Sequence, residues 1–218
     1  MTRRPIPPAA LVLTAVVALT LSGCGGEDSS SDREGKAPGV SAGDGPSASP
    51  SPSDSMAEGR PRIEFPSDAK NLFEGEKTGD SAKDAVLADN ALSINAVDEA
   101  IFKGSADTKA LGFYNVDKAL SSSIAYVQGY IDDNDTWIGV TRYFDRRVTL
   151  RGADKAYVTY CSDESKSYIK NRKSGMVDRS AASADSYVLY NTAVTKNAVG
   201  VWQTTDISSK RGDAACQP

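Results

Sequence analysis

The chain has 218 residues, which is enough for one domain and an additional segment. Its 25 Lys and Arg against 29 Asp and Glu give a net charge of -4, so it lacks the basic surplus that nucleic-acid binding requires. The absence of His excludes Ser-His-Asp and Cys-His nucleophiles and ordinary zinc or haem sites. We therefore expect no cofactor, no metal and no nucleic-acid partner.

The amino terminus combines a basic start with a short apolar run. Arg3 and Arg4 precede residues 9 to 21, which are apolar apart from two Thr. This run is too short to span a bilayer, which takes about 20 residues, and it predicts a secretory signal peptide over residues 1–23. The Arg pair leaves the export route open between the general secretory and the twin-arginine pathway.

The signal peptide ends in Leu21-Ser22-Gly23-Cys24, which resembles the lipobox of bacterial lipoproteins. In those proteins the Cys receives a diacylglycerol, and fatty acyl chains such as palmitate add roughly 0.8 kcal/mol of membrane binding per buried methylene. The resemblance implies a protein anchored through diacylglyceryl Cys24 to the extracytoplasmic face of the cell membrane. The alternative is an ordinary secreted protein with a Cys near its cleavage site.

Gly, Ser and Pro dominate the segment that follows Cys24. They fill 21 of the 38 positions from 25 to 62, so this segment cannot bury enough apolar surface to offset the entropy of ordering it. We expect residues 24–65 to form a disordered tether that holds the domain roughly 35 Å from the anchor. The globular domain is then expected over residues 66–218.

Two helices are predicted at the start of this domain from apolar residues at steps of three and four. The first is expected to start at Asp80, Ser81 or Asp84 and to end at Gly104. The second runs from Phe113 to Ile131. The apolar residues of the first are Leu87, Ala91, Ile94, Val97 and Ile101, and those of the second are Phe113, Val116, Leu120, Ile124, Val127 and Ile131.

Beyond Trp137 the apolar period changes to two, which predicts strands. The expected strands are Trp137 to Phe144, Arg147 to Arg151, Lys155 to Asp163, Tyr187 to Thr195 and Val199 to Ile207. Short links between most of them imply antiparallel hairpins, and residues 164–185 are expected to form an exposed loop. The fold class is therefore α+β, with two N-terminal helices packed on a curved antiparallel sheet of four to six strands.

Two cysteines remain if Cys24 carries lipid. In an oxidising compartment we expect Cys161 and Cys216 to form a disulfide that pins the C-terminal tail across the sheet. The alternative is a pair of free thiols.

Two resemblances follow from these patterns. The order of elements resembles the cone-shaped fold of the nuclear transport factor, ketosteroid isomerase and scytalone dehydratase superfamily. Several segments also resemble uncharacterised secreted lipoproteins of high-GC Gram-positive bacteria, which implies a family without an assigned mechanism. These segments are Phe73-Glu74-Gly75, Thr159-Tyr160-Cys161-Ser162-Asp163-Glu164-Ser165-Lys166, Ser186-Tyr187-Val188-Leu189-Tyr190-Asn191-Thr192 and Gly200-Val201-Trp202-Gln203-Thr204-Thr205-Asp206.

Two groups of residues are candidate binding sites. A basic group in the expected loop could contact anionic headgroups or wall polymers, at about 1 kcal/mol per residue, or it could be a solvated loop. An aromatic group could line a pocket, or it could be ordinary core packing. The basic group is Lys166, Lys170, Arg172, Lys173 and Arg179, and the aromatic group is Tyr126, Tyr130, Tyr160, Tyr190 and Trp202.

These patterns favour a non-catalytic binding or interaction module of the cell envelope, with a cell-wall component or an envelope protein as its partner. The alternative is a small-molecule pocket protein or a His-free enzyme of the cone-fold superfamily, and no catalytic residue can be assigned. An inward Asp beside a Tyr in a closed cavity would favour the alternative. An interior filled by Tyr and Trp would favour the module.

Overall fold

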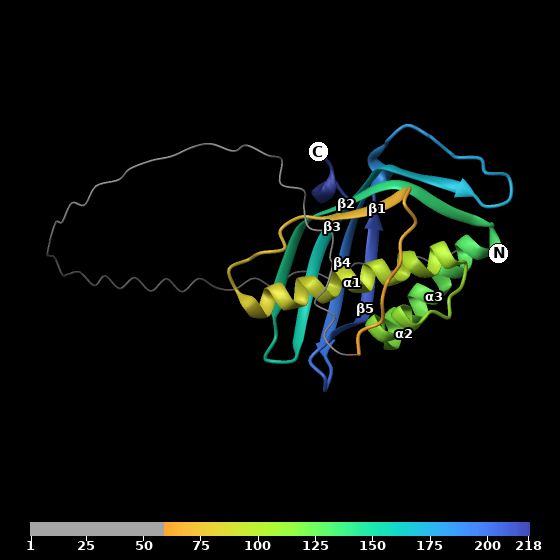
Figure 1. The fold of residues 1–218 in the computed structure, drawn as a ribbon. Coiled ribbons are helices and arrows are strands. Elements are labelled where there is room, and N and C mark those ends of the chain that lie inside the picture. Colours follow the sequence, from red (N-terminus) through yellow and green to blue (C-terminus); the bar gives the residue numbers. More distant parts are fainter. Residues whose placement is uncertain (1–58) are drawn as a thin grey trace, which may run out of the picture. The chain divides into compact units, whose positions relative to one another are not determined.

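The computed structural model describes residues 59 to 218, which form one five-stranded sheet with three helices against one face (Figure 1). The predicted α+β class is confirmed. The expected signal peptide, Cys24 and most of the expected tether lie outside the described residues. Within residues 59 to 218, no helix is both long and apolar enough to cross a membrane.

Helix α1, Ser81–Lys103, agrees with the first predicted helix. It begins at Asp80, whose carboxylate accepts hydrogen bonds from the amides of Ala82 and Lys83 and so satisfies two otherwise unpaired donors. It ends at Gly104, whose φ of 62° is left-handed and therefore suits Gly. Local capping residues fix both ends of this helix.

The second predicted helix is wrong as a single element, because it is divided into α2, Lys109–Tyr114, and α3, Asp117–Asp132. The division occurs at Asn115, a buried residue whose Oδ1 accepts a hydrogen bond from Ser93 Oγ at 2.9 Å. The next amide, of Val116, donates to the Thr204 carbonyl at 2.9 Å. The chain leaves the helix here because these tertiary hydrogen bonds replace the helical ones.

The sheet has the strand order β1-β2-β3-β4-β5. Its first strand was not predicted, and because β1 runs parallel to β2 the sheet is mixed rather than purely antiparallel. The other neighbours pair antiparallel, as expected. The strands are β1 Ala69–Phe73, β2 Asp135–Leu150, β3 Lys155–Asn171, β4 Tyr187–Lys196 and β5 Trp202–Arg211.

Two further corrections concern β2 and β3. The expected strands Trp137–Phe144 and Arg147–Arg151 form one strand, because the link between them is an irregularity in β2 at Asp145, with φ 48°, and not a hairpin turn. The expected loop over residues 164–185 is also shorter. β3 continues to Asn171 and pairs with the first residues of β2.

The segment before β1 packs against α1. Arg60 forms an ion pair with the buried Asp89, and the amide of Glu64 donates to Glu99 Oε1 at 3.0 Å. The Phe65 ring meets the Phe102 ring edge-on at 4.9 Å. We call residues 60–65 the strap. These contacts place the strap in the folded part of the chain, ahead of the expected boundary at residue 66.

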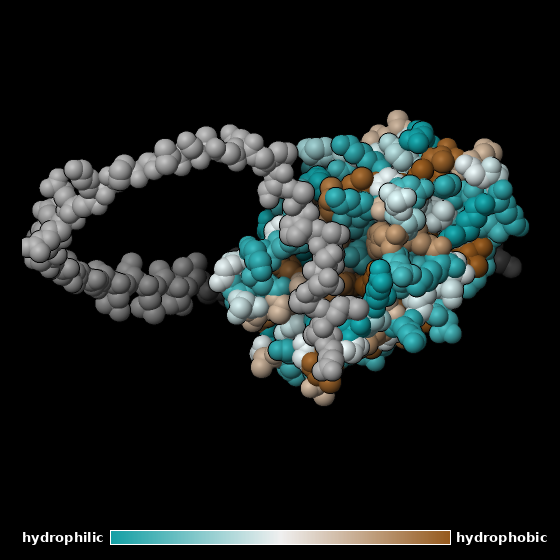
Figure 2. Space-filling view, in the orientation of Figure 1, coloured by the Kyte–Doolittle hydropathy of each residue, from teal (hydrophilic) through white to brown (hydrophobic). Residues whose placement is uncertain are grey.

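The predicted disulfide between Cys161 and Cys216 is confirmed. Cys161 lies between Tyr160 and Ser162 in β3, and Tyr160 belongs to the core under the helices. Because neighbouring side chains in a strand point to opposite faces, the disulfide lies on the sheet face away from the helices. Figure 2 shows the molecule in the orientation of Figure 1, and the face seen there is mainly hydrophilic with small, separate apolar patches.

Replacing both cysteines, as Cys161→Ser with Cys216→Ser, should lower the free energy of unfolding by about 4 kcal/mol. The bridge joins residues 55 positions apart, so its loss frees a long loop in the unfolded chain. Urea unfolding of the double variant and of the oxidised chain measures this difference. Equal midpoints would contradict a stabilising role for the bridge.

Candidate functional site

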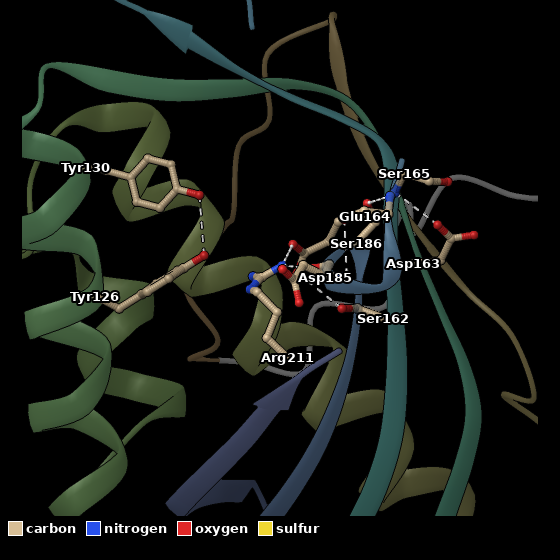
Figure 3. Close-up of polar contacts among 10 residues, drawn as sticks. Tyr126, Tyr130, Ser162, Asp163, Glu164, Ser165, Asp185, Ser186 and Arg211 are labelled. Carbon is tan, nitrogen blue, oxygen red and sulfur yellow. Dashed lines mark hydrogen bonds and ion pairs between the residues drawn. The ribbon is translucent and has the colours of Figure 1, made fainter. Parts of the chain in front are cut away.

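Aromatic and charged side chains from α3, β3 and β5 come together where β5 ends (Figure 3). We call Tyr126, Tyr130, Glu164 and Arg211 the rim cluster. The two tyrosines point from α3 toward Arg211, and Arg211 points toward Glu164. Among residues 59 to 218 no hydrogen bond or ion pair links the tyrosines to Arg211 or Glu164, so the cluster has an aromatic half on α3 and a charged half on the sheet.

An irregularity in β3 positions Glu164. Val140 pairs with Lys166 and Arg142 with Asp163, so Glu164 and Ser165 together face the single residue between them on β2. Such a bulge changes the direction in which a side chain points. Beside it, Gly139 has a φ of 99°, and a Cβ there would overlap the carbonyl oxygen of Lys166. Gly139 is therefore required for this close approach of β2 and β3.

An ion pair holds the charged half of the rim cluster. Arg211 Nη1 lies 2.7 Å from Glu164 Oε2 and also donates to the Asp185 carbonyl at 2.6 Å. Ser162 Oγ donates to the other Glu164 oxygen at 3.2 Å. The Arg211 side chain is 48% exposed and the Glu164 side chain is 26% exposed. Within residues 59 to 218, the remaining N–H groups of Arg211 make no hydrogen bond.

The disulfide lies next to this ion pair in the sequence. Cys161 is three residues before Glu164, and Cys216 is five residues after Arg211. The bridge therefore fixes β3 to the segment that follows β5, close to both members of the pair.

Tyr126 and Tyr130 form the aromatic half. They are four residues apart on α3 and therefore lie on the same helix face, with ring centroids 5.4 Å apart and hydroxyl oxygens 3.4 Å apart. Tyr126 is 50% exposed, yet the surrounding protein desolvates its hydroxyl and raises its pKa well above the usual value, with smaller contributions from Tyr130 and Tyr190. Desolvation also raises the pKa of Tyr130, and Glu164 adds to this effect. Both hydroxyls are neutral donors at pH 7.

A buried acid, Asp98 on α1, lies deeper between the helices and the sheet. Trp137 Nε1 donates to its Oδ1 at 3.2 Å, and Asn71 Nδ2 donates to its Oδ2 at 2.6 Å. Burial raises the pKa of Asp98 to about 7, although both hydrogen bonds favour the ionised form. Both oxygens of this acid are therefore held by neighbouring side chains.

Aromatic rings occupy the interior around Asp98. Tyr160 stacks on Tyr190 with centroids 5.0 Å apart, and Tyr143 meets the edge of Tyr160 at 6.0 Å. Phe73 stacks on Tyr143 at 4.9 Å. Tyr143, Tyr160 and Trp137 are all buried.

The structure divides the five aromatic residues of the expected pocket. Tyr126 and Tyr130 belong to the rim cluster, and Tyr160 and Tyr190 stack in the interior. Trp202 is buried in the same hydrophobic cluster as Tyr160 and Tyr190, although it lies at the other end of β5 from Arg211. The ammonium group of Lys196 is 5.6 Å from its ring.

Most of the expected basic group makes contacts within the protein. Arg172 donates to the carbonyls of Ile101 and Phe102 at the end of α1. Lys170 lies 3.5 Å from an Asp68 oxygen, and the Arg179 guanidinium lies 4.8 Å from the centre of the Tyr168 ring. The other two members, Lys166 and Lys173, are exposed.

Sequence reasoning missed Asp98, Glu164 and Arg211. A signal for Asp98 existed, because it lies four residues after Ile94 and three before Ile101 and so shares their helix face. Glu164 and Arg211 gave no such signal, because their meeting depends on the bulge and on the pairing of β3, β4 and β5.

Comparisons with known proteins give similarity in structure alone. The sequence matches no protein-family model, and no curated protein matches it significantly. A ketosteroid isomerase-like protein from Erwinia carotovora is 16% identical, with a TM-score of 0.39 over 58% of this chain and 93% of its own. A protein from Shewanella frigidimarina, provisionally assigned as a ketosteroid isomerase, is 15% identical, with a TM-score of 0.33 over 64% of this chain and 100% of its own. Both neighbours are of the ketosteroid isomerase-like kind.

Asp98 should make stability fall as pH rises. Its pKa of about 7 in the folded chain exceeds the ordinary value of 3.8, so between these values the folded chain holds a proton that the unfolded chain lacks. The resulting stabilisation is complete below about pH 4 and is lost through pH 7. The free energy of unfolding is measured in urea for Asp98→Asn and for the unsubstituted chain. Between pH 5 and pH 8, the value for Asp98→Asn should rise by roughly 2 to 3 kcal/mol relative to the value for the unsubstituted chain. Parallel pH curves for the two proteins would contradict this assignment.

Arg172 and Lys173 provide a matched test of the basic group. Arg172→Ala should lower the free energy of unfolding by roughly 1 to 3 kcal/mol, because the carbonyls at the end of α1 lose charged donors. Lys173→Ala should change it by less than about 0.5 kcal/mol, because that side chain is exposed. Thermal unfolding of both variants measures the difference. Equal effects would show that Arg172 does not hold α1.

Proposed function

We propose that this chain is a lipid-anchored protein of the extracytoplasmic cell envelope that binds a partner without transforming it. In this proposal Cys24 carries the diacylglyceryl anchor, residues before the strap form the tether, and the rim cluster is the binding surface. The partner is a component of the cell wall or envelope.

The non-catalytic role is proposed because the acid in the interior, Asp98, is already hydrogen-bonded to neighbouring side chains. A general acid or base must reach the reacting group within hydrogen-bond distance. Both oxygens of Asp98 accept hydrogen bonds, from Trp137 and Asn71, and the neighbouring core holds the stacked rings of Tyr160 and Tyr190. This arrangement favours an interior that stabilises the fold over one that carries out a reaction.

The rim cluster differs from the interior because its groups remain accessible. Half of Tyr126 and about half of the Arg211 side chain are exposed. The ion pair and the disulfide hold this surface in one geometry before a partner arrives, which lowers the entropy cost of binding. A preformed, partly exposed cluster of this kind suits recognition.

The position of the strap also supports the proposal. Arg60 pairs with Asp89, and Asp89 accepts a hydrogen bond from the amide of Trp202 at the first residue of β5. Arg211 is the last residue of that strand, nine residues further along, which is a distance of about 30 Å. The rim cluster therefore lies far from the point where Arg60 and the first residue of β5 share Asp89.

Cell fractionation and envelope sedimentation test this proposal together. The unsubstituted chain should stay with membranes, and Cys24→Ser should release it, because the acyl chains are lost. The purified Cys24→Ser chain should then sediment with isolated cell envelopes. Adding Tyr126→Ala and Arg211→Met should reduce the sedimented fraction at least fivefold.

Tyr157 provides the matched control, because it is a tyrosine of similar exposure, 54%, outside the rim cluster. Tyr157→Ala in the Cys24→Ser chain should leave sedimentation unchanged. Membrane retention of Cys24→Ser would contradict the anchor. An equal loss from Tyr157→Ala, or no sedimentation of the Cys24→Ser chain, would contradict binding through the rim cluster.

A further inference from the structure

Resting on the proposed function, we infer that the rim cluster binds a neutral sugar, with neighbouring hydroxyl groups placed on the Arg211–Glu164 pair and a ring face placed on Tyr126. Four features of the cluster lead to this ligand class: its free donors, its acceptor, its balanced charge and its exposed aromatic ring.

The donors come from Arg211 and the tyrosines. Of the guanidinium nitrogens of Arg211, only Nη1 hydrogen-bonds to other residues between 59 and 218, so the other two can donate to a ligand oxygen. The hydroxyls of Tyr126 and Tyr130 contact each other at 3.4 Å, at the long limit for a hydrogen bond.

Glu164 supplies the acceptor beside these donors. Its oxygens receive Arg211 and Ser162, and a carboxylate has about four acceptor positions, so each oxygen can take a further hydrogen bond. A donor and an acceptor side by side match two neighbouring hydroxyls, of which one accepts from the guanidinium and the other donates to the carboxylate.

The charge of the cluster selects against ionic ligands. Arg211 and Glu164 carry opposite charges in one ion pair, and the Asp185 carboxylate lies beside Gly212, the residue after Arg211. A ligand carboxylate would meet Glu164 with like charge and would offer it no donor. A ligand amine would meet Arg211 with like charge and would offer it no acceptor. A neutral polyhydroxyl ligand satisfies both side chains.

Tyr126 supplies the surface for a sugar ring. The Tyr126 residue is half exposed, and its ring meets the Tyr130 ring edge-on at 5.4 Å and 72°. The face of an aromatic ring is negative, so it attracts the weakly positive C–H groups on the flat side of a sugar. The rigid Tyr pair adds this contact with little loss of side-chain freedom.

Titration of the full chain with soluble oligosaccharides tests the inference. The chain is purified in a detergent without a sugar headgroup, and the probes are cellotetraose and the β-1,4-linked tetramer of N-acetylglucosamine. Saturation-transfer NMR and calorimetry should detect binding of at least one probe. Tyr126→Ala and Arg211→Met should each weaken it at least tenfold, whereas Tyr157→Ala should change it less than twofold.

Folding of each variant is checked by its thermal unfolding curve, and Tyr126→Leu serves as a second variant that keeps an apolar side chain. Acetate and methylammonium at the same concentration should not displace the sugar. Binding of neither probe, displacement by acetate or methylammonium, or equal losses from Tyr157→Ala and Tyr126→Ala would overturn the inference. If envelopes still sediment the chain through the rim cluster while neither oligosaccharide binds, the sugar inference alone fails.

Discussion

The arrangement of this fold depends on helix α1, which buries five polar residues between Asp89 and Glu99. A buried polar group costs free energy unless it is hydrogen-bonded. Each of these residues therefore requires a hydrogen-bonding partner at a fixed position beside the helix. The partners come from the strap, the sheet and the segment between α2 and α3. The pairs are Asp89 with Arg60 and the Trp202 amide, Asn90 with Arg146, Ser93 with Asn115 and Thr204, Asp98 with Asn71 and Trp137, and Glu99 with the Glu64 amide and Lys103.

Because these buried polar residues already have partners within the protein, the polar groups that can bind a ligand lie elsewhere. The acid of the interior, Asp98, is held by two donors, and the interior tyrosines stack on one another. At the end of β5 the same residue types are less constrained, because Arg211 and Tyr126 are partly exposed. The disulfide fixes the backbone on both sides of the ion pair. The proposed binding surface therefore lies at the edge of the core rather than inside it.

The features that the sequence predicted correctly depend on residues close together in the chain or on a residue type that occurs only a few times. The ends of α1 follow from Asp80 and Gly104, and the disulfide follows from two remaining cysteines. In each case, residues close in sequence or few in number decide the outcome.

The patterns that failed depended on partners distant in sequence. The division between α2 and α3 needs the Thr204 carbonyl, and the short strand β1 needs β2 as its template. The sequence assigns the strap to the tether, because its contacts with Asp89 and Glu99 of α1 involve residues distant in sequence. Glu164 reaches Arg211 only through a bulge and two strand pairings. No periodicity in a single segment contains this information.

Hydrogen–deuterium exchange of the full chain, with and without isolated cell envelopes, tests the central claim most directly. The account predicts protection confined to the second half of α3, to β3 around Glu164 and to the end of β5 around Arg211. The sheet face around Tyr157 should exchange at the same rate with and without envelopes. Protection centred on that face, or on the exposed basic residues around Lys173, would contradict it.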